Sequence, residues 1–318
     1  MSEFKPLIEV WRGDILESTH FGAIAVVGTD GELVDFIGDI DCASYPRSAA
    51  KLMQATAMVK AGLDLAPNQL ALVAASHSGG DTHVQVLNQI LQQHGFTSTD
   101  LKCTPFLPLG SKERKMYSGA PSSDRSDCSG KHSGFLVTTK INEWDLETYL
   151  EPSHPLQNAI KKEIELQTST PVKHTTVDGC GAPLYSSSLH GLAVAFNRAV
   201  QAAPESAERQ VADAMRAYPE LVGGSGREVT EAMKSLPGLL CKDGADGVFA
   251  MAHPDHGAVA FKISDGGVRG VNLLIREILT RWGVQKFSSD LRDFPVIGGG
   301  KSVGKNRPSA ALANLKLG

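Results

Sequence analysis

The sequence predicts an α+β protein built on an antiparallel sheet, with helices packed on the sheet and a helical subdomain in the middle of the chain. Strand-like runs occupy residues 6–38 and 247–263, and most of the chain between them has helical patterns. This order differs from the regular strand–helix alternation that produces a parallel sheet. The 318 residues contain neither an internal repeat nor a linker rich in Gly or Ser. We therefore expect a single domain over residues 1–318.

The N-terminal elements follow from local patterns. Apolar runs on both sides of residues 29–31 (Thr-Asp-Gly) predict a hairpin. Apolar residues at helical spacing predict a helix over residues 48–62, which ends at a glycine. The short apolar run ALVAAS, residues 71–76, predicts a strand. Residues 106–130 are rich in Pro, Gly, Ser and Asp, which indicates a long functional loop.

The later helices are predicted from apolar residues that recur every three or four positions. They cover residues 82–94, 132–142, 155–167, 184–201, 205–217, 226–235 and 269–282. The stretch GVFAMAHPDHGAVAFKI, residues 247–263, alternates on both sides of a central turn and predicts a second hairpin.

Composition narrows the class of protein. The formal net charge is −4, which argues against a general nucleic-acid binder. No stretch approaches the ~18 apolar residues of a membrane span, and the N-terminus lacks the apolar segment of a secretory signal. We therefore expect a cytoplasmic protein. The five cysteines are an odd, scattered set, unlike a disulfide framework, and we expect Cys42 and Cys103 to be buried thiols.

Two Ser-x-x-Lys pairs raise the question of a nucleophile beside its base. In SYPRSAAK, Ser48 precedes Lys51 by one helical turn, so the hydroxyl and the amine can meet on one face. Such pairs serve in acyl transfer. The spacing recurs at Ser302 and Lys305, in what the pattern indicates is a loop. There GGGKS imitates a phosphate loop, but Pro295 stands where that motif needs glycine, so we do not expect nucleotide binding.

Three glycine-punctuated stretches are candidates for a site: ASHSGGDTH, DCSGKHSGF and VDGCGAP. Glycine beside a polar residue lets the backbone approach a ligand closely. A cysteine is most often a buried small hydrophobe, but exposed tight turns fit that explanation poorly for Cys128 and Cys180. Two thiolates suit zinc, which needs a third ligand. His132 and His77 are the nearest histidines in the sequence, and Lys131 could bind only when deprotonated.

Taken in order, PRSAAK, SHSG, CSGKH and DGCGAP resemble the zinc-containing L-asparaginase family of rhizobial type (asparaginase II, class 3). The stretches PELVGGSGR, CKDGADGVFA, FKISDGG and GGGKSVGKNRP fit as well, so the resemblance covers nearly the whole chain. It implies a fold similar to that of serine β-lactamases and glutaminases, and a homodimer. The implied reaction is hydrolysis of L-asparagine to L-aspartate and ammonia.

The resemblance also implies roles for particular residues. The catalytic groups would be two Ser–Lys pairs, Ser48 with Lys51 and Ser76 with Lys242. The ligands of Zn²⁺ would be Cys128, Lys131 and Cys180. The substrate-binding residues would be Arg47, Asp178 and His77, with Asp178 also close to the metal. Ser78 is an alternative to Ser76 in the second pair. Family members have a glutamate after SHSG, where this chain has Gly80 and Asp81.

The implied chemistry makes demands on these groups. Serine is a weak nucleophile until a base takes its proton, so Lys51 would need a pKa well below its usual ~10.4. Burial, the helix dipole and a second cation such as Lys242 could each lower it, and activity should then rise between about pH 7 and 9. We assign the attack to Ser48. Two alternatives stay open: a serine amidohydrolase of the same fold acting on glutamine or a β-lactam, or a non-catalytic thiol–zinc protein.

Overall fold

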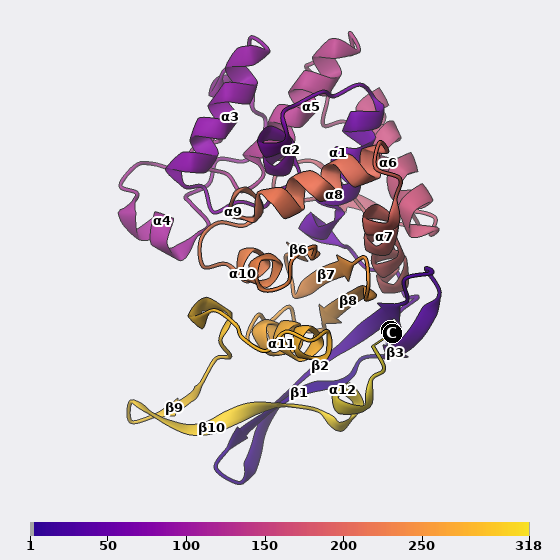
Figure 1. Ribbon diagram of the computed structural model, residues 1–318. Coiled ribbons are helices and arrows are strands. Elements are labelled where there is room, and N and C mark those ends of the chain that lie inside the picture. The colour runs from indigo at the N-terminus through magenta and orange to yellow at the C-terminus, as the bar shows by residue number, and fades with distance from the viewer. Residues whose placement is uncertain (1–2, 318) are drawn as a thin grey trace.

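The computed structural model describes residues 3–317, and an antiparallel sheet lies at its centre (Figure 1). Within these residues the sheet has eight strands, in the order β6-β7-β8-β2-β1-β10-β9, with β3 paired to β2 off this path. All the pairings are antiparallel, which confirms the α+β prediction. The strands are β1 Lys5–Arg12, β2 Ile15–Val27, β3 Leu33–Ile37, β6 Leu240–Gly244, β7 Val248–His253, β8 Gly257–Ile263, β9 Val296–Gly298 and β10 Lys301–Pro308.

Most of the helices gather on one side of this sheet (Figure 1). Helix α7 packs against β2, β7 and β8, while α11 and α12 contact β10 and β1. The α-helices are α1 Lys51–Lys60, α2 Pro67–Val73, α3 Asp81–Gln93, α4 Ser111–Met116, α5 Ser129–Ile141, α6 Pro155–Thr168, α7 Leu189–Gln201, α8 Ala207–Ala217, α9 Pro219–Val222, α10 Glu228–Ser235, α11 Val271–Arg281 and α12 Ala310–Asn314. Three 3₁₀ turns are η1 Arg47–Ala50, η2 Ser98–Asp100 and η3 Ser289–Leu291. A small hairpin pairs β4 Thr175–Val177 with β5 Pro183–Tyr185.

Several predicted elements are confirmed. The two hairpins are β2–β3 and β7–β8. Helices α3, α5, α6, α8, α10 and α11 lie within three residues of their predicted bounds. The predicted helix over residues 48–62 begins as the 3₁₀ turn η1 and continues as α1, and Gly62 follows it with a φ of +96°. Ser48 therefore lies at a helix start, as expected.

Two element predictions are wrong. Residues 71–73 belong to helix α2 instead of a strand, and α2 begins at Pro67. A short apolar run cannot be assigned from periodicity alone, and the informative signal was the proline at the first helical position. The helix predicted over 184–201 begins only at Leu189, because Ser188 caps it by accepting from Gly191 N, and the residues before it form β5.

Two loop predictions also need correction. The stretch 106–130 contains helix α4, a bridge between Phe106 and Ser122, and the first residues of α5. Ser302 lies in strand β10 instead of a loop. A register irregularity lies between Ser302 and Gly304, and Ser302 Oγ donates to Gly304 O at 3.2 Å. The Ser302 hydroxyl therefore has a backbone partner instead of Lys305.

Candidate active site

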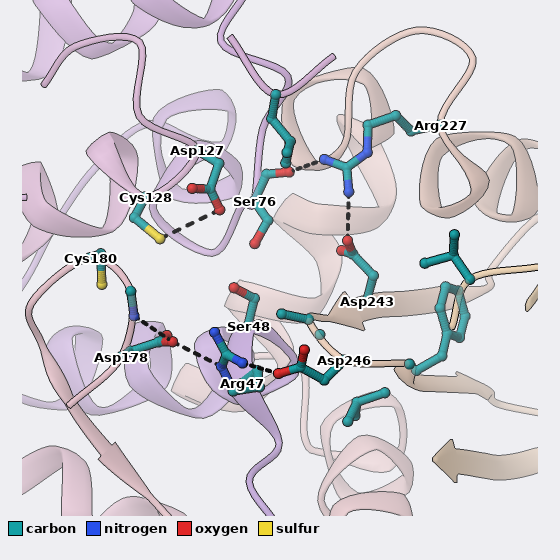
Figure 2. Close-up of a pocket in the computed structure, with 18 of the residues that line it drawn as sticks. Arg47, Ser48, Ser76, Asp127, Cys128, Asp178, Cys180, Arg227, Asp243 and Asp246 are labelled. Atoms are coloured by element: carbon teal, nitrogen blue, oxygen red, sulfur yellow. Dashed lines mark hydrogen bonds and ion pairs between the residues drawn. The ribbon is translucent and has the colours of Figure 1, made fainter. Parts of the chain in front are cut away.

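A cavity of about 350 Å³ lies where η1, the segment after α2, the start of α5, the β4–β5 turn and the β6–β7 hairpin converge (Figure 2). The sheet and the helical region meet here, because η1 packs against β6 and β7. The charged and polar residues that line the cavity are Arg47, Ser48, Ser76, Ser126, Asp127, Cys128, Asp178, Cys180, Arg227, Glu228, Asp243 and Asp246. Segments far apart in the sequence therefore supply one site.

Ser48 lies in η1 with its side chain half-buried at the cavity, and its hydroxyl forms no hydrogen bond within residues 3–317. The preceding residue, Arg47, has a φ of +50°, in the left-handed region that few non-glycine residues adopt. Two carboxylates hold Arg47 in this conformation: Nε donates to Asp178 Oδ1 at 2.9 Å, and Nη1 pairs with Asp246. The predicted substrate-binding residues Arg47 and Asp178 thus contact each other.

Lys51 lies beneath the cavity and is only 1% exposed. Its Nζ donates to Ala75 O at 2.7 Å, to Ser76 Oγ at 2.9 Å and to Cys128 Sγ at 3.0 Å. The hydroxyl that Lys51 contacts is therefore Ser76, although Ser48 was its expected partner. Figure 2 shows the Ser48 and Ser76 side chains in the middle of the same cavity. Ser78, the alternative to Ser76, bonds Gly223 O at 2.9 Å instead.

The expectation of a lowered pKa for Lys51 is wrong for the described chain. Burial does lower the pKa of Lys51, but the neighbouring Cys128 thiol and Asp127 carboxylate raise it by more, so the result lies above the usual value. The sequence analysis considered burial, the helix dipole and a neighbouring lysine. It did not place a thiol and a carboxylate directly beside the amine.

Lys242 is a second buried lysine, with no exposed surface, and its partner is the adjacent Asp243 instead of Ser76. Burial lowers the pKa of Lys242, and the Asp243 carboxylate offsets this only in part. Arg227 also pairs with Asp243, at 2.5 Å, and donates to the backbone carbonyl of Ser76. Burial raises the pKa of Asp243, but Lys242 and Arg227 lower it by more, so this carboxylate is ionised.

The predicted metal ligands Cys128, Lys131 and Cys180 are brought together, and all three are buried instead of exposed as the turns suggested. Lys131 Nζ lies 3.1 Å from Cys180 Sγ. Hydrogen bonding between the two thiols lowers the pKa of Cys180 and raises that of Cys128, so the pair holds one negative charge. Burial lowers the pKa of Lys131, but both cysteines raise it by more, and it is protonated here.

The two histidines considered as further ligands lie in different surroundings. His132 Nδ1 bonds Tyr149 Oη at 3.1 Å, and its buried Nε2 finds no hydrogen-bond partner within residues 3–317. His77 is fully buried and does not line the cavity. Its Nε2 bonds Ser129 Oγ, and its Nδ1 accepts from Gly79 N. No group of three or more His, Cys, Asp or Glu residues among those described could hold a metal, so a metal here would need Lys131.

Sequence reasoning missed three charged residues that define the cavity: Arg227, Asp243 and Asp127. A signal existed for all three, since Asp127 begins the stretch DCSGKHSGF, Arg227 ends PELVGGSGR and Asp243 belongs to CKDGADGVFA. The two other cysteines lie elsewhere. Cys103 is buried as expected, and burial raises the pKa of its thiol to about 11, whereas Cys42 is only half-buried.

Three buried lysines distinguish this site from an ordinary cluster of polar side chains. Lysine is almost never fully buried unless it is paired, yet Lys51, Lys131 and Lys242 are each at most 1% exposed around one cavity. The model of the family described as L-asparaginase II matches residues 8–308. The chain belongs to the L-asparaginase II family. This membership supports an amidohydrolase activity, and the amide substrate is a small molecule.

None of the curated proteins matches the chain significantly. Among solved structures, a Bacillus subtilis glutaminase in covalent complex with 5-oxo-L-norleucine is 14% identical, with a TM-score of 0.40 over 84% of this chain and 89% of that one. A β-lactamase from Mycobacterium bovis is 14% identical, with a TM-score of 0.39 over 83% and 95%. None of the helices within residues 3–317 has the length and apolar character that crossing a membrane requires.

Proposed function

We propose that the chain is an L-asparaginase that hydrolyses L-asparagine to L-aspartate and ammonia through an acyl-enzyme on Ser48. The observation that supports this most strongly is a pair of serines that line one cavity, one of them in contact with the buried Lys51, in a chain of the L-asparaginase II family. A solvent-accessible hydroxyl without a protein partner suits attack on a substrate, and this describes Ser48 better than the 2%-exposed Ser76.

The proposed proton path uses the observed contact between Lys51 and Ser76. In this mechanism Lys51 must first lose a proton, because the thiol and the carboxylate beside it raise its pKa. Neutral Lys51 then takes the proton of Ser48 through Ser76, at 2.9 Å from Lys51 Nζ, and returns a proton by the same route to the departing ammonia. The carbonyl carbon gains a bond to Ser48 Oγ and loses its bond to nitrogen, which gives a β-aspartyl ester. Water then attacks the ester and releases L-aspartate. Backbone N–H groups at the start of η1 and α1 suit the developing oxyanion.

The charged residues of the cavity would hold the two ends of the amino acid. Arg227 can bind the α-carboxylate of the substrate, because one guanidinium carries several donors and Asp243 takes only part of them. Asp127 and Asp178 line the opposite part of the cavity and can take the α-ammonium group. Arg47 then acts mainly by fixing Asp178.

We further propose that Cys128, Cys180 and Lys131 bind Zn²⁺. The donor set fits, since two thiols that hold one negative charge, beside an amine, form a site that favours zinc over magnesium or calcium. Binding requires both thiols and the amine to be deprotonated. When bound, the ion supplies positive charge that offsets the thiolate charge beside Lys51. We also propose a homodimer, which comes from the family resemblance alone, and a cytoplasmic location, which comes from the sequence pattern.

Ammonia release tests the proposed function directly. Purified protein should release ammonia from L-asparagine, and Ser48→Ala should lose on the order of 10³-fold or more in kcat. Ser302→Ala is the matched control and should retain wild-type activity, since Ser302 lies in β10 away from the cavity. Release from L-glutamine but not from L-asparagine would show that the substrate is wrong. Full activity in Ser48→Ala would show that the nucleophile is wrong.

A further inference from the structure

A second cavity, of about 650 Å³, opens at the N-terminus of α3. The segment 76–80 separates it from the first cavity, because Ser76 lines the first and Gly80 lines the second. None of the residues assigned above to catalysis, zinc or substrate binding lines this second cavity. It is therefore a different site.

One side of the second cavity presents two unpartnered hydrogen-bond acceptors. His83 is 5% exposed; its Nε2 donates to Glu220 O at 2.9 Å, so Nδ1 carries a lone pair, and this Nδ1 has no partner within residues 3–317. The Glu113 carboxylate also makes no hydrogen bond or ion pair within the described chain. A Cβ added at Gly80 would lie 3.4 Å from His83 Nδ1 and 3.7 Å from Glu113 Oε1, so both acceptors face the same space.

The same cavity also contains donors for an anion. Helix α3 has 13 residues, Gly80 is its N-cap, and no side chain caps its first N–H groups, which therefore carry the positive end of the helix dipole. Lys112 lines the cavity and has no ion-pair partner among the described residues. Arg125 is already occupied, since it pairs with Asp81 at 2.8 Å and donates to Gly79 O at 3.0 Å.

We propose that this second cavity binds a free α-amino acid. The ammonium group would lie at Glu113 and His83 Nδ1, and the carboxylate at the N-terminus of α3 and Lys112. The acceptors and the donors lie beside each other, since His83 belongs to the first turn of α3 and Glu113 lies next to its N-cap Gly80. An α-amino acid carries its ammonium and carboxylate groups on the same carbon and so matches both. An inorganic anion would leave the buried His83 acceptor unsatisfied, and a metal ion would leave the helix N-terminus and Lys112 unmatched.

Equilibrium dialysis with L-aspartate, on the full-length protein, tests this proposal. Wild-type protein should bind two equivalents per chain, one in each cavity. Glu113→Gln and Lys112→Met each remove one end of the second site and should lower its affinity at least tenfold, leaving one equivalent. Glu151→Gln is the charge-matched control, on an exposed residue outside the cavity, and should bind two.

The outcomes separate this proposal from the proposed function. Equal binding by wild type, Glu113→Gln and Lys112→Met would overturn the second site, whether the shared value is one equivalent or none. One equivalent in wild type that both variants lose would support the second site and would count against aspartate binding in the first cavity. The circular dichroism spectra of both variants must match the wild-type spectrum. Lys112 is exposed and Glu113 half-exposed, and if one variant misfolds, the other still tests the proposal.

Discussion

Removing the negative charge of Asp243 should cost far more stability than removing the positive charge of its partner Lys242. Asp243 lies between two cations: Lys242, with no exposed surface, and Arg227, whose side chain is 15% exposed. Asp243→Asn leaves Lys242 buried without a counter-charge and leaves Arg227 with only Glu228, at 4.0 Å. Breaking a buried pair in this way costs about 3–5 kcal/mol, because a desolvated charge remains.

Lys242→Met has the opposite consequence. Methionine fills a similar apolar volume, and Asp243 keeps its ion pair with Arg227 at 2.5 Å, so no isolated charge is left behind. Replacing a buried ion by a well-packed apolar side chain is often neutral or stabilising. We therefore expect a change within about 1 kcal/mol in the free energy of unfolding.

Urea denaturation of both variants, with activity measured in parallel, makes the comparison. Asp213→Asn is the control, because Asp213 pairs with Arg209 and Arg216 but is 51% exposed. It should cost no more than about 1 kcal/mol. The reasoning is refuted if Asp243→Asn costs no more than this control, or if Lys242→Met destabilises the protein as much as Asp243→Asn does.

Three further predictions follow from the site and its surroundings. Protein purified without added metal should contain about one zinc per chain, and chelation should abolish activity until zinc is restored; less than about a tenth of an equivalent in active protein would contradict this. Arg227→Lys should raise KM about tenfold with a smaller effect on kcat, because a planar two-point contact to the carboxylate is lost; an unchanged KM would remove Arg227 from substrate binding. Burial lowers the pKa of His77 and His83 below their unfolded value of ~6.5, so both stay neutral in the folded state and their contribution to stability is lost as pH falls below that value; urea unfolding at pH 5 and 7.5 should show this loss, reduced in His77→Gln.

The sequence predicted the fold class well because its two hairpins have strong local signals. Apolar runs on both sides of residues 29–31 and alternating residues around 254–256 specify β2–β3 and β7–β8 without reference to the rest of the chain. Helix α2 was missed because a buried apolar run looks the same in a helix and in a strand. The position of β10 beside β1 could not be predicted, since it depends on pairing between residues about 300 positions apart.

For the site, the local motifs identified residues that lie at the cavity. They were less successful in predicting which residues contact each other. The motifs correctly indicated that Cys128, Lys131 and Cys180 lie together, but the partner of Lys51 turned out to be Ser76, which comes from a different segment. The pKa of Lys51 was misjudged for the same reason. It depends on Cys128 and Asp127, which reach Lys51 only through the packing of α5 against α1 and α2.

Locating the acyl-enzyme tests the central claim most directly. The protein would be trapped with a slowly hydrolysed β-aspartyl ester or hydroxamate, digested, and analysed by peptide mass spectrometry. The account predicts an adduct on Ser48, in the peptide that also contains Lys51, and no adduct in Ser48→Ala. An adduct on Ser76 would contradict it and would make Ser76, with Lys51 at 2.9 Å, the nucleophile and its base.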